Sequence, residues 1–381
     1  MRWISLPYLL LSFVCCFQSG AQTIPSPPSE AGIGDTLDHT PPLANLSPEL
    51  RRPAVASAMR KVGDWEMARA QPRFSRDWTF AALYAGYMAA ARALPERKYQ
   101  AAMLDMANRF HWVPGPRKSL ADDQAVAQTY LALYSIYREP HMIVPTEDQF
   151  NTLMAQPDDP AHPVWWWCDA LFMAPPVWAR LYGATNDIAY LNYMDREWRI
   201  TSALLYDPQE HLFFRDATYL HKREANGEKL FWSRGNGWVM AGLARVLEEM
   251  PQDYPARAKY IDQFRQMTAR IAGLQSADGL WRPGLLDPQA YPLPEVSGSS
   301  FFIYAIAWGI NHHLLDRATY FPVVKKGWQG LLQHVYDDGR LGSIQPIGSA
   351  PDAYSATSSY VYGVGAFLLA GSEIMDLSKK K

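Results

Sequence analysis

Helical periodicity runs almost without interruption through the chain after residue 47, and no other feature restricts the fold as strongly. Apolar residues recur three and four positions apart, as at Leu83, Tyr87, Ala90 and Leu94, which is the spacing of one face of an α-helix. Few segments alternate between apolar and polar residues as β-strands do. The pattern predicts twelve helices, at residues 48–69, 77–94, 96–110, 121–137, 147–155, 170–183, 187–204, 236–250, 254–274, 299–315, 320–336 and 357–376.

Twelve helices make six hairpins if consecutive helices pack as antiparallel pairs. Three of the predicted loops share one chemistry, an acidic residue followed by glycine or histidine, apolar residues and an arginine, at residues 210–215, 278–282 and 338–342. Loops that repeat in this way predict an all-α fold, the (α/α)6 toroid, with these loops at one end of the ring. The alternative is an open superhelix of helical repeats. The varied, aromatic-rich helices disfavour it, because the repeats of a solenoid usually resemble one another.

The first 21 residues have the pattern of a secretory signal peptide. Arg2 provides the basic start, Leu6 to Phe17 the apolar run, and Ser19-Gly20-Ala21 the small residues of a cleavage site. The apolar run is too short to span a bilayer. Residues 22–47 are predicted to be an irregular, proline-rich lead that packs poorly, and residues 48–381 the helical domain.

The cysteines support an exported protein. Cys15 and Cys16 lie inside the signal, so the mature chain would keep only Cys168. One cysteine excludes an intrachain disulfide and a thiolate metal site. Export without disulfides favours a bacterial periplasm. A lipoprotein anchor at Cys15 or Cys16 is disfavoured, because Phe13 and Val14 suit that signal poorly.

The charge balance excludes some partners, and the aromatic content suggests others. The chain has 36 basic and 38 acidic residues, a formal net charge of −2, so neither nucleic acid nor an anionic membrane is indicated as a partner. The 14 tryptophans and 21 tyrosines are more than a core requires. They fit either a carbohydrate-binding cleft or a closely packed helical protein.

Asp169 lies in the most unusual stretch of the sequence, directly after Trp165-Trp166-Trp167-Cys168. Apolar surroundings disfavour a charged carboxylate, so the pKa of Asp169 should rise towards values useful in proton transfer. The alternative is that Asp169 only caps the helix that begins at Ala170, because aspartate is a favoured N-cap. Three consecutive tryptophans beside an acid are large for filler and suit the binding of a sugar ring.

Two sequence blocks resemble those of the unsaturated rhamnogalacturonyl hydrolases, glycoside hydrolase family 105, which are related to the unsaturated glucuronyl hydrolases of family 88. The first is the tryptophan-rich segment 165–176, with its aspartate and Leu-Phe-Met. The second is Phe231-Trp232-Ser233-Arg234-Gly235-Asn236-Gly237-Trp238. The resemblance implies the toroid fold and a protein that needs neither metal nor organic cofactor. It also implies that Asp169 is the catalytic acid.

The same resemblance implies roles for two further elements. An aspartate at the start of the helix near residue 121 would assist the catalytic acid and contact the sugar. Asp122 and Asp123 both qualify, either could be a simple cap, and we prefer Asp123 as the catalytic partner and Asp122 as a substrate contact. Arg234 would bind the substrate carboxylate through its guanidinium fork. The alternative for Arg234 is a structural role, donating to loop carbonyls beside Gly235 and Gly237.

Other candidate contacts to the substrate are one cation and several aromatic rings. Arg215 stands where many relatives have histidine, so it would keep a cationic contact but would not titrate near neutral pH. Trp238, Trp232, Trp167 and Trp78 would line the cleft. Packing in the core is the alternative for each of these rings. The histidines show no metal-binding spacing.

The sequence therefore predicts a glycoside hydrolase of unusual chemistry. By resemblance it removes a 4,5-unsaturated uronic acid from the non-reducing end of lyase-generated, rhamnogalacturonan-type oligosaccharides, by hydration of the double bond. An unsaturated glucuronyl hydrolase, a sugar epimerase or a polysaccharide lyase on the same toroid are alternative enzymes. A carbohydrate-binding protein without activity is the alternative of another class. The leaving sugar and the oligomeric state stay open.

Overall fold

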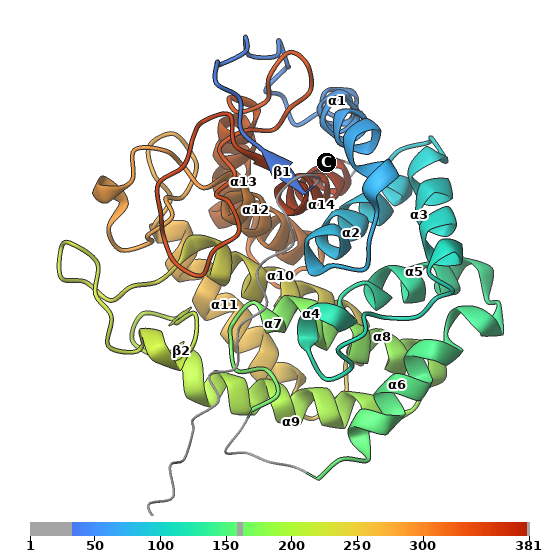
Figure 1. The fold of residues 1–381 in the computed structure, drawn as a ribbon. Helices are drawn as coiled ribbons and strands as arrows, with labels where there is room; N and C mark the ends of the chain where they lie inside the picture. The colour runs from blue at the N-terminus through green and yellow to red at the C-terminus, as the bar shows by residue number, and fades with distance from the viewer. Residues whose placement is uncertain (1–32, 158–162, 379–381) are drawn as a thin grey trace, which may run out of the picture.

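The computed structural model describes residues 33–157 and 163–378, and in it two concentric rings of helices surround a common axis (Figure 1). The inner ring consists of α2 (Trp78–Ala93), α5 (Ala127–Tyr137), α8 (Pro175–Thr185), α10 (Ser233–Glu249), α12 (Val296–Asn311) and α14 (Val361–Leu377). The outer ring consists of α1 (Arg52–Ala70), α3 (Lys98–Arg109), α6 (Val144–Met154), α9 (Ile188–Leu205), α11 (Arg257–Gly273) and α13 (Arg317–Leu332).

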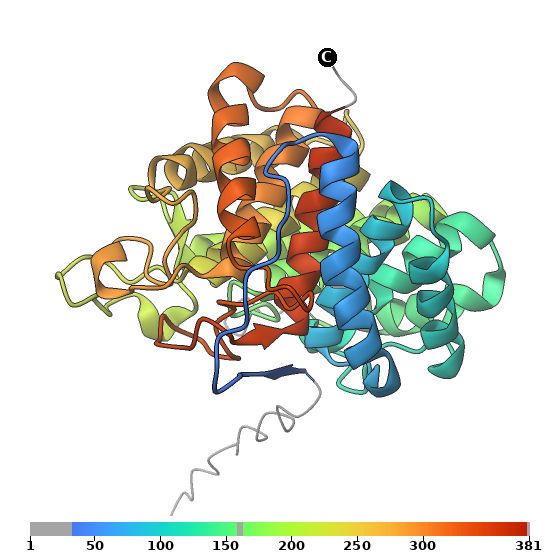
Figure 2. The same cartoon turned by 90° about the horizontal axis from the view of Figure 1, so that it is seen from above.

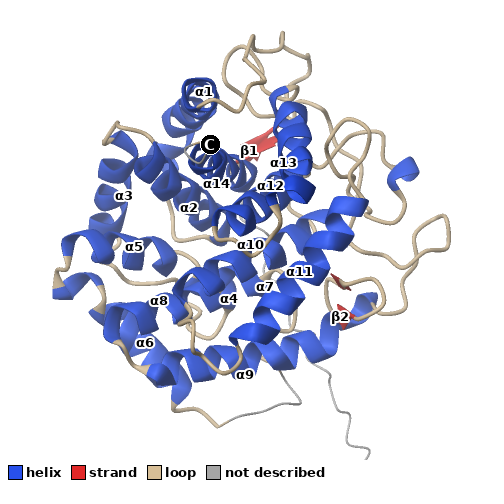
Figure 3. Cartoon of the chain, turned by 180° about the vertical axis from the view of Figure 1, so that it is seen from behind, coloured by secondary structure: helices blue, strands red, loops and turns tan. Residues whose placement is uncertain are grey.

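Each inner helix contacts the next, and α14 packs against α2 to close the ring. The predicted all-α class and (α/α)6 toroid are therefore confirmed. Two short helices, α4 (Ala121–Gln124) and α7 (Ala170–Met173), precede α5 and α8. The strands form only two two-stranded sheets in the described part of the chain, and helices dominate the view from behind (Figure 3).

The two rings differ in which of their faces are buried. Every residue of α12 is buried, and so are nearly all residues of α14, because an inner helix has neighbours on all sides. The outer helix α1 buries one stripe that includes Val55, Met59 and Val62. The inner helices also approach closely: a Cβ on Gly86 of α2 would lie 2.5 Å from the Gly365 carbonyl oxygen of α14. Glycine is thus required where α2 and α14 close the ring.

Most of the predicted helices occur, with informative differences at their ends. Asp77 and Asp187 cap α2 and α9 as the start signals predicted. The predicted helix 299–315 begins three residues earlier, because Glu295 accepts hydrogen bonds from the Ser297 and Gly298 N–H groups. Glutamate is not among the usual capping residues, so the sequence signal was misread.

Two predicted helices are interrupted and another is shortened. The segment 121–137 divides into α4 and α5, and 170–183 divides into α7 and α8 where Pro175 and Pro176 follow, because proline lacks the N–H group that continues a helix. The predicted helix 357–376 begins at Val361 instead. Its first residues form strand β4 (Ser359–Tyr360), which pairs with β1 (Gly34–Asp35).

The described part of the proline-rich lead is irregular and mostly exposed, yet it is anchored. Ile33 is buried, Ala44 N–H donates to the Val335 carbonyl oxygen at 2.9 Å, and Asp35 forms an ion pair with Arg340 at 2.6 Å. The lead therefore follows the surface beside α13 and α14, where we had expected poor packing. The predicted signal peptide, residues 1–21, lies outside the described residues. No helix of the described chain is long and apolar enough to cross a membrane.

Candidate active site

The predicted site residues gather where the inner helices begin. Five elements begin at Trp78, Ala121, Ala170, Ser233 and Val361, and contacts between aromatic side chains near their starts place the N-termini of α2, α10 and α14 at one end of the ring. Trp78 stacks on Tyr362 with centroids 5.4 Å apart and meets Trp238 edge-on at 6.1 Å. Helix N-termini carry partial positive charge, so this end of the ring attracts anionic groups.

Asp169 occupies the N-cap position of α7 without acting as a cap. Its backbone is already helical (φ −64°, ψ −28°), and its side chain makes no capping hydrogen bond. The Cys168 thiol donates to Oδ1 of Asp169, with a distance of 3.2 Å from Sγ. The alternative interpretation of Asp169 as a helix cap is therefore wrong. Its carboxyl group is free to face the end of the ring.

Burial raises the pKa of Asp169 above the ordinary value for aspartate. Arg215, the Cys168 hydrogen bond and Arg234 oppose this effect, and Asp216 reinforces it. Burial outweighs the nearby cations because it penalises the charged form of the carboxyl group. A carboxyl group tuned in this direction can hold a proton and donate it.

Asp122 is the second carboxyl group of the site, from the first turn of α4. Burial raises the pKa of Asp122 to about 7, and the negative charges of Asp169 and Asp77 act in the same direction against Arg117. Asp169 is therefore close enough to Asp122 for its charge to act on the Asp122 carboxyl group. The ionised form of Asp169 therefore favours the protonated form of Asp122.

Asp123, the neighbour of Asp122, has a different environment. Its carboxylate forms an ion pair with Arg117, at 2.6 Å from Oδ1 to Nη2, and accepts the Arg117 backbone N–H at 2.7 Å. The Asp123 carbonyl oxygen accepts the Gly115 N–H at 2.7 Å. Asp123 therefore fastens the loop 115–117 to α4. Our preference for Asp123 as the assisting acid is corrected on this ground, and Asp122 takes its place in the proposal below.

Arg234 is fully buried and its fork is occupied. Nη1 donates to the Gln345 carbonyl oxygen and Nη2 to the Pro346 carbonyl oxygen, both at 2.8 Å. Glu295 lies 3.7 Å from Nη1, and the guanidinium stacks 4.4 Å from the centroid of Trp232. This geometry matches the structural alternative, in which Arg234 donates to loop carbonyls. The prediction that Arg234 binds the substrate carboxylate is corrected accordingly.

Arg215 is the cation that accompanies Asp169. Its side chain is 19% exposed, interacts electrostatically with Asp169, and donates from Nη1 to Asp216 Oδ2 at 2.6 Å. The loop that carries it is fixed to the tryptophan-rich segment, because the Cys168 N–H donates to the Arg215 carbonyl oxygen at 2.8 Å and Trp167 pairs with Asp216. Arg215 is therefore held beside Asp169 with part of its guanidinium accessible.

The tryptophans divide into accessible and buried rings. Trp78 is partly exposed, and Trp166 is 48% exposed with the Arg215 guanidinium 5.5 Å from its ring centroid. Trp167, Trp232 and Trp238 are buried, as the core-packing alternative predicted. The sequence missed Trp166 as a candidate, because nothing in three consecutive tryptophans shows which ring faces solvent.

Two further carboxyl groups, which were not among the predicted site residues, support the site. Glu295 is fully buried and accepts hydrogen bonds from the Ser297 hydroxyl and the Gln345 N–H, so it fixes the loop that Arg234 also holds. Asp77 caps α2 and adds negative charge beside Asp122. Within the described residues, no group of three or more His, Cys, Asp or Glu side chains is arranged to hold a metal ion.

Comparison with known proteins identifies relatives along nearly the whole chain. The "Unsaturated 3S-rhamnoglycuronyl hydrolase" of Formosa agariphila is 39% identical over 351 residues, 87% of this chain and 93% of the relative. A protein of the same name from Alteromonas sp. (strain LOR) is 30% identical over 403 residues, 99% of this chain and 98% of the relative. The solved structure of "Polysaccharide Lyase BACCELL_00875" superimposes with a TM-score of 0.82 at 32% identity, covering 87% of this chain and 99% of that one.

Comparison with whole protein families agrees with these relatives. The model of Glycosyl Hydrolase Family 88 matches residues 52–378, which extend from the first residue of α1 to just past the end of α14. The matched region includes both blocks that carried the resemblance. The protein is a glycoside hydrolase, and the chain belongs to Glycosyl Hydrolase Family 88.

Proposed function

We propose that the protein removes a 4,5-unsaturated uronic acid from the non-reducing end of oligosaccharides released by lyases, with a rhamnose-type sugar as the leaving group. The unsaturated uronate follows from the family and from the names of the relatives. The rhamnose-type leaving group is supported by those names alone. The observation that carries the proposal is the state of Asp169. Its carboxyl group is partly buried, makes no capping hydrogen bond, and lies near Arg215 and Asp122.

The mechanism requires one carboxyl group that donates a proton and then accepts one. Protonated Asp169 gives its proton to C4 of the double bond, and positive charge develops at C5 and on the ring oxygen. The Asp169 carboxylate then takes a proton from water as the water oxygen bonds to C5. The resulting hemiketal opens by breaking the bond between C5 and the ring oxygen. C1 becomes a hemiacetal, which releases the leaving sugar as an alcohol.

The neighbouring residues adjust this cycle. Burial and the negative charge of Asp169 raise the pKa of Asp122 to about 7, so Asp122 can hold a proton near neutral pH while Asp169 is ionised. Arg215 binds the uronate carboxylate through the part of its guanidinium that Asp216 does not occupy. Trp78 and Trp166 offer rings on which sugar faces stack. An ordinary glycosidase instead needs a carboxyl pair across the scissile bond.

A polysaccharide lyase is the second candidate, because one similar solved protein carries that name. The two reactions change the same chromophore in opposite directions. A hydrolase of this kind destroys the conjugated double bond and lowers the absorbance near ~235 nm, whereas a lyase creates the bond and raises it. The substrates differ too: lyase-generated oligosaccharides for the first reaction and the intact polysaccharide for the second.

The deciding experiment measures this absorbance with both substrates. The purified protein is mixed with unsaturated oligosaccharides that end in a uronate on rhamnose, and separately with the parent polysaccharide. We expect a fall with the oligosaccharides and no change with the polymer. A rise with the polymer would establish the lyase. Binding of the oligosaccharides without any change in absorbance would support a carbohydrate-binding protein, and a preference for other lyase products a glucuronyl hydrolase.

We also propose that the chain is exported across the inner membrane to a bacterial periplasm. The support is the signal-like pattern of residues 1–21. Mass spectrometry of the protein from fractionated cells tests this. Export predicts a periplasmic protein that begins near residue 22, and a cytoplasmic protein that begins at Met1 would contradict it.

A further inference from the structure

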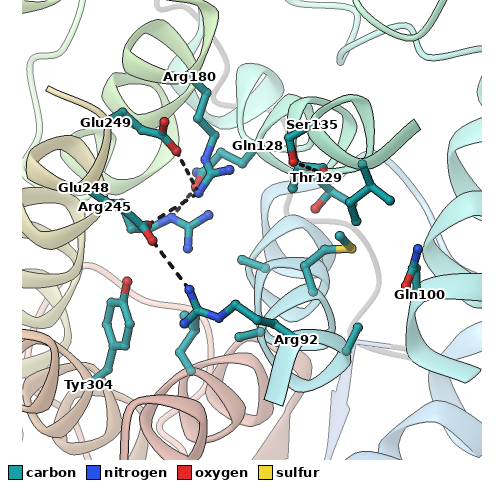
Figure 4. Close-up of a pocket in the computed structure, with 17 residues that line it drawn as sticks. Arg92, Gln100, Gln128, Thr129, Ser135, Arg180, Arg245, Glu248, Glu249 and Tyr304 are labelled. Carbon is teal, nitrogen blue, oxygen red and sulfur yellow. Dashed lines mark hydrogen bonds and ion pairs between the residues drawn. The ribbon is translucent and has the colours of Figure 1, made fainter. Parts of the chain in front are cut away.

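A cavity lies towards the end of the ring opposite Asp169. Its volume is about 380 Å³ (Figure 4), which lies within the size range of small-molecule sites. Its lining includes Arg92 and Ser135, near the last residues of α2 and α5, and Glu248, next to the last residue of α10. The active-site residues instead lie where the inner helices begin. The cavity therefore lies further along α2 and α10 than the active-site residues do.

Two of the three arginines in this cavity have carboxylate partners. Arg92 pairs with Glu373 at 2.7 Å and with Glu248 at 3.5 Å. Arg180 pairs with Glu249 at 3.3 Å and with Glu248 at 3.7 Å. Neither arginine requires a further anion.

Arg245 is the third arginine, and its guanidinium has no such partner. Its side chain is 6% exposed, its Nε donates to Gln128 Oε1 at 2.7 Å, and the Tyr304 hydroxyl interacts with it. Across residues 33–157 and 163–378, no carboxylate oxygen lies within 4.0 Å of the Arg245 nitrogens. Figure 4 shows the guanidinium pointing into the cavity.

This arrangement is unusual because a buried charge is normally paired. Burial lowers the pKa of Arg245, and the neighbouring Arg180 acts in the same direction. A guanidinium nevertheless keeps its proton in proteins. The Gln128 side chain is held in this orientation, because its Nε2 donates to the Phe172 carbonyl oxygen at 2.7 Å. Its Oε1 therefore stays the acceptor for Arg245 Nε. Arg245 is therefore a fixed positive charge that faces an accessible cavity.

The chemistry around Arg245 indicates which anion fits. A guanidinium fork matches the two oxygens of a carboxylate, and the Tyr304 hydroxyl lies beside the fork. Met88, Ile136 and Leu369 supply apolar wall for a carbon skeleton. Glu248 lies close enough to act on Arg245 electrostatically, so it would repel a phosphate or sulfate dianion more strongly than a monocarboxylate.

We propose that this cavity binds a compact organic monocarboxylate, held by Arg245 and Tyr304. The proposal does not rest on the proposed function, because the cavity shares no residue with the active site. The position of Arg245 on α10, eleven residues after Arg234, separates the two ends by roughly 16 Å along the helix. A ligand here would therefore occupy a site separate from the substrate.

The experiment compares butyrate with butyramide, its neutral counterpart of similar shape, in thermal unfolding and isothermal titration calorimetry of the whole protein. At constant ionic strength, butyrate at about ten times its Kd should raise the Tm by roughly 2 °C. Butyramide, sulfate and phosphate should not raise it. Equal effects of butyrate and butyramide, no effect of butyrate, or preferential binding of sulfate or phosphate would each overturn the proposal.

Two variants and one control assign the binding to this cavity. Arg245→Met should abolish the butyrate effect while keeping the fold, because replacing an unpaired buried charge by an apolar side chain is often neutral or stabilising. Tyr304→Phe should weaken binding about fivefold, the cost of one hydrogen bond, and it decides the matter if Arg245→Met does not fold. Arg257→Met is the control: Arg257 is also buried, but its Nη1 donates to the Leu247 carbonyl oxygen away from the cavity. Butyrate binding that survives in Arg245→Met would overturn the assignment. So would full affinity for butyrate in Tyr304→Phe.

Discussion

The adjacent aspartates Asp122 and Asp123 should respond to the same substitution with opposite changes in stability. Asp122→Asn removes a charge that burial and Asp169 disfavour, so it should stabilise the protein. Asp123→Asn removes the charged partner of Arg117, so it should destabilise the protein. The two variants are matched in sequence position, chemistry and side-chain volume, which makes each the control for the other.

The magnitude for Asp122 follows from its pKa. The folded-state value of about 7 lies roughly 3 units above the ordinary value of 3.8. At 1.36 kcal/mol per unit, the ionised carboxyl costs at most about 4 kcal/mol above pH 7. Because the side chain is partly exposed to solvent and coupled to Asp169, we expect about 2 kcal/mol. This corresponds to a gain of roughly 3 °C in Tm for a domain of this size.

The pH dependence gives the sign of the effect. Well below pH 4 both the folded and the unfolded protein hold the Asp122 proton, so the Asp122 carboxyl group does not lower the free energy of unfolding. As the pH rises from about 4 through 7, the unfolded state loses its proton first, so the wild type loses stability. Asparagine carries no such penalty. The Tm advantage of Asp122→Asn should therefore be small at pH 4 and full at pH 8.

Thermal unfolding of the three proteins at pH 4, 6 and 8, followed by circular dichroism, measures these differences. Asp123→Asn should lower the free energy of unfolding at pH 8 by about 1–2 kcal/mol, the cost of weakening a hydrogen bond to a charged group. An Asp122→Asn variant that is less stable than the wild type at pH 8 would refute the reasoning. So would a gain of equal size at pH 4 and pH 8.

Three further substitutions test the roles assigned at the active site. Asp169→Asn should lower turnover on unsaturated oligosaccharides by at least ~10²-fold, without loss of Tm because no cap bond is removed; retained turnover would exclude Asp169 as the acid. Arg215→Lys should raise KM with little change in kcat, because lysine loses the fork for the substrate carboxylate; an unchanged KM would exclude Arg215 as the carboxylate contact. Arg234→Lys should lower the free energy of unfolding by about 1–3 kcal/mol, because lysine cannot donate to two carbonyl groups at once. A normal Tm with a raised KM in that variant would return Arg234 to substrate binding.

The fold could be predicted from sequence because its signals are local. Helical periodicity after residue 47 and aspartate caps such as Asp77 depend on neighbours within a few positions, so most helices were found. The errors also have local causes. Glu295 is an uncommon cap, and the strand pairing of Ser359–Tyr360 with Gly34–Asp35 joins segments from opposite ends of the chain. Periodicity contains no information about such a contact.

The site was less predictable because its roles depend on direction and on distant partners. The side chains of Asp122 and Asp123 point in directions about 100° apart around the helix axis. Only the ion pair between Arg117 and Asp123 shows that Asp123 is the one turned towards the protein. Arg234 was expected to bind substrate because it lies between tryptophans and glycines. Its partners, the carbonyl groups of Gln345 and Pro346, come from a loop more than a hundred positions away. Arg245 could not have been noticed from sequence, since seven different helices contribute residues to its cavity.

The pairing of β1 with β4 determines where each end of the described chain leaves the molecule. Strand β1 lies beside the start of α14, at the end of the ring that carries Asp169, whereas α14 finishes at the opposite end (Figure 2). The 17 residues of α14 separate these exits by roughly 25 Å. An affinity tag or surface attachment joined to the end of α14 would therefore start at the end of the ring opposite Asp169. A polypeptide joined directly before residue 33 would instead start at the end that carries Asp169.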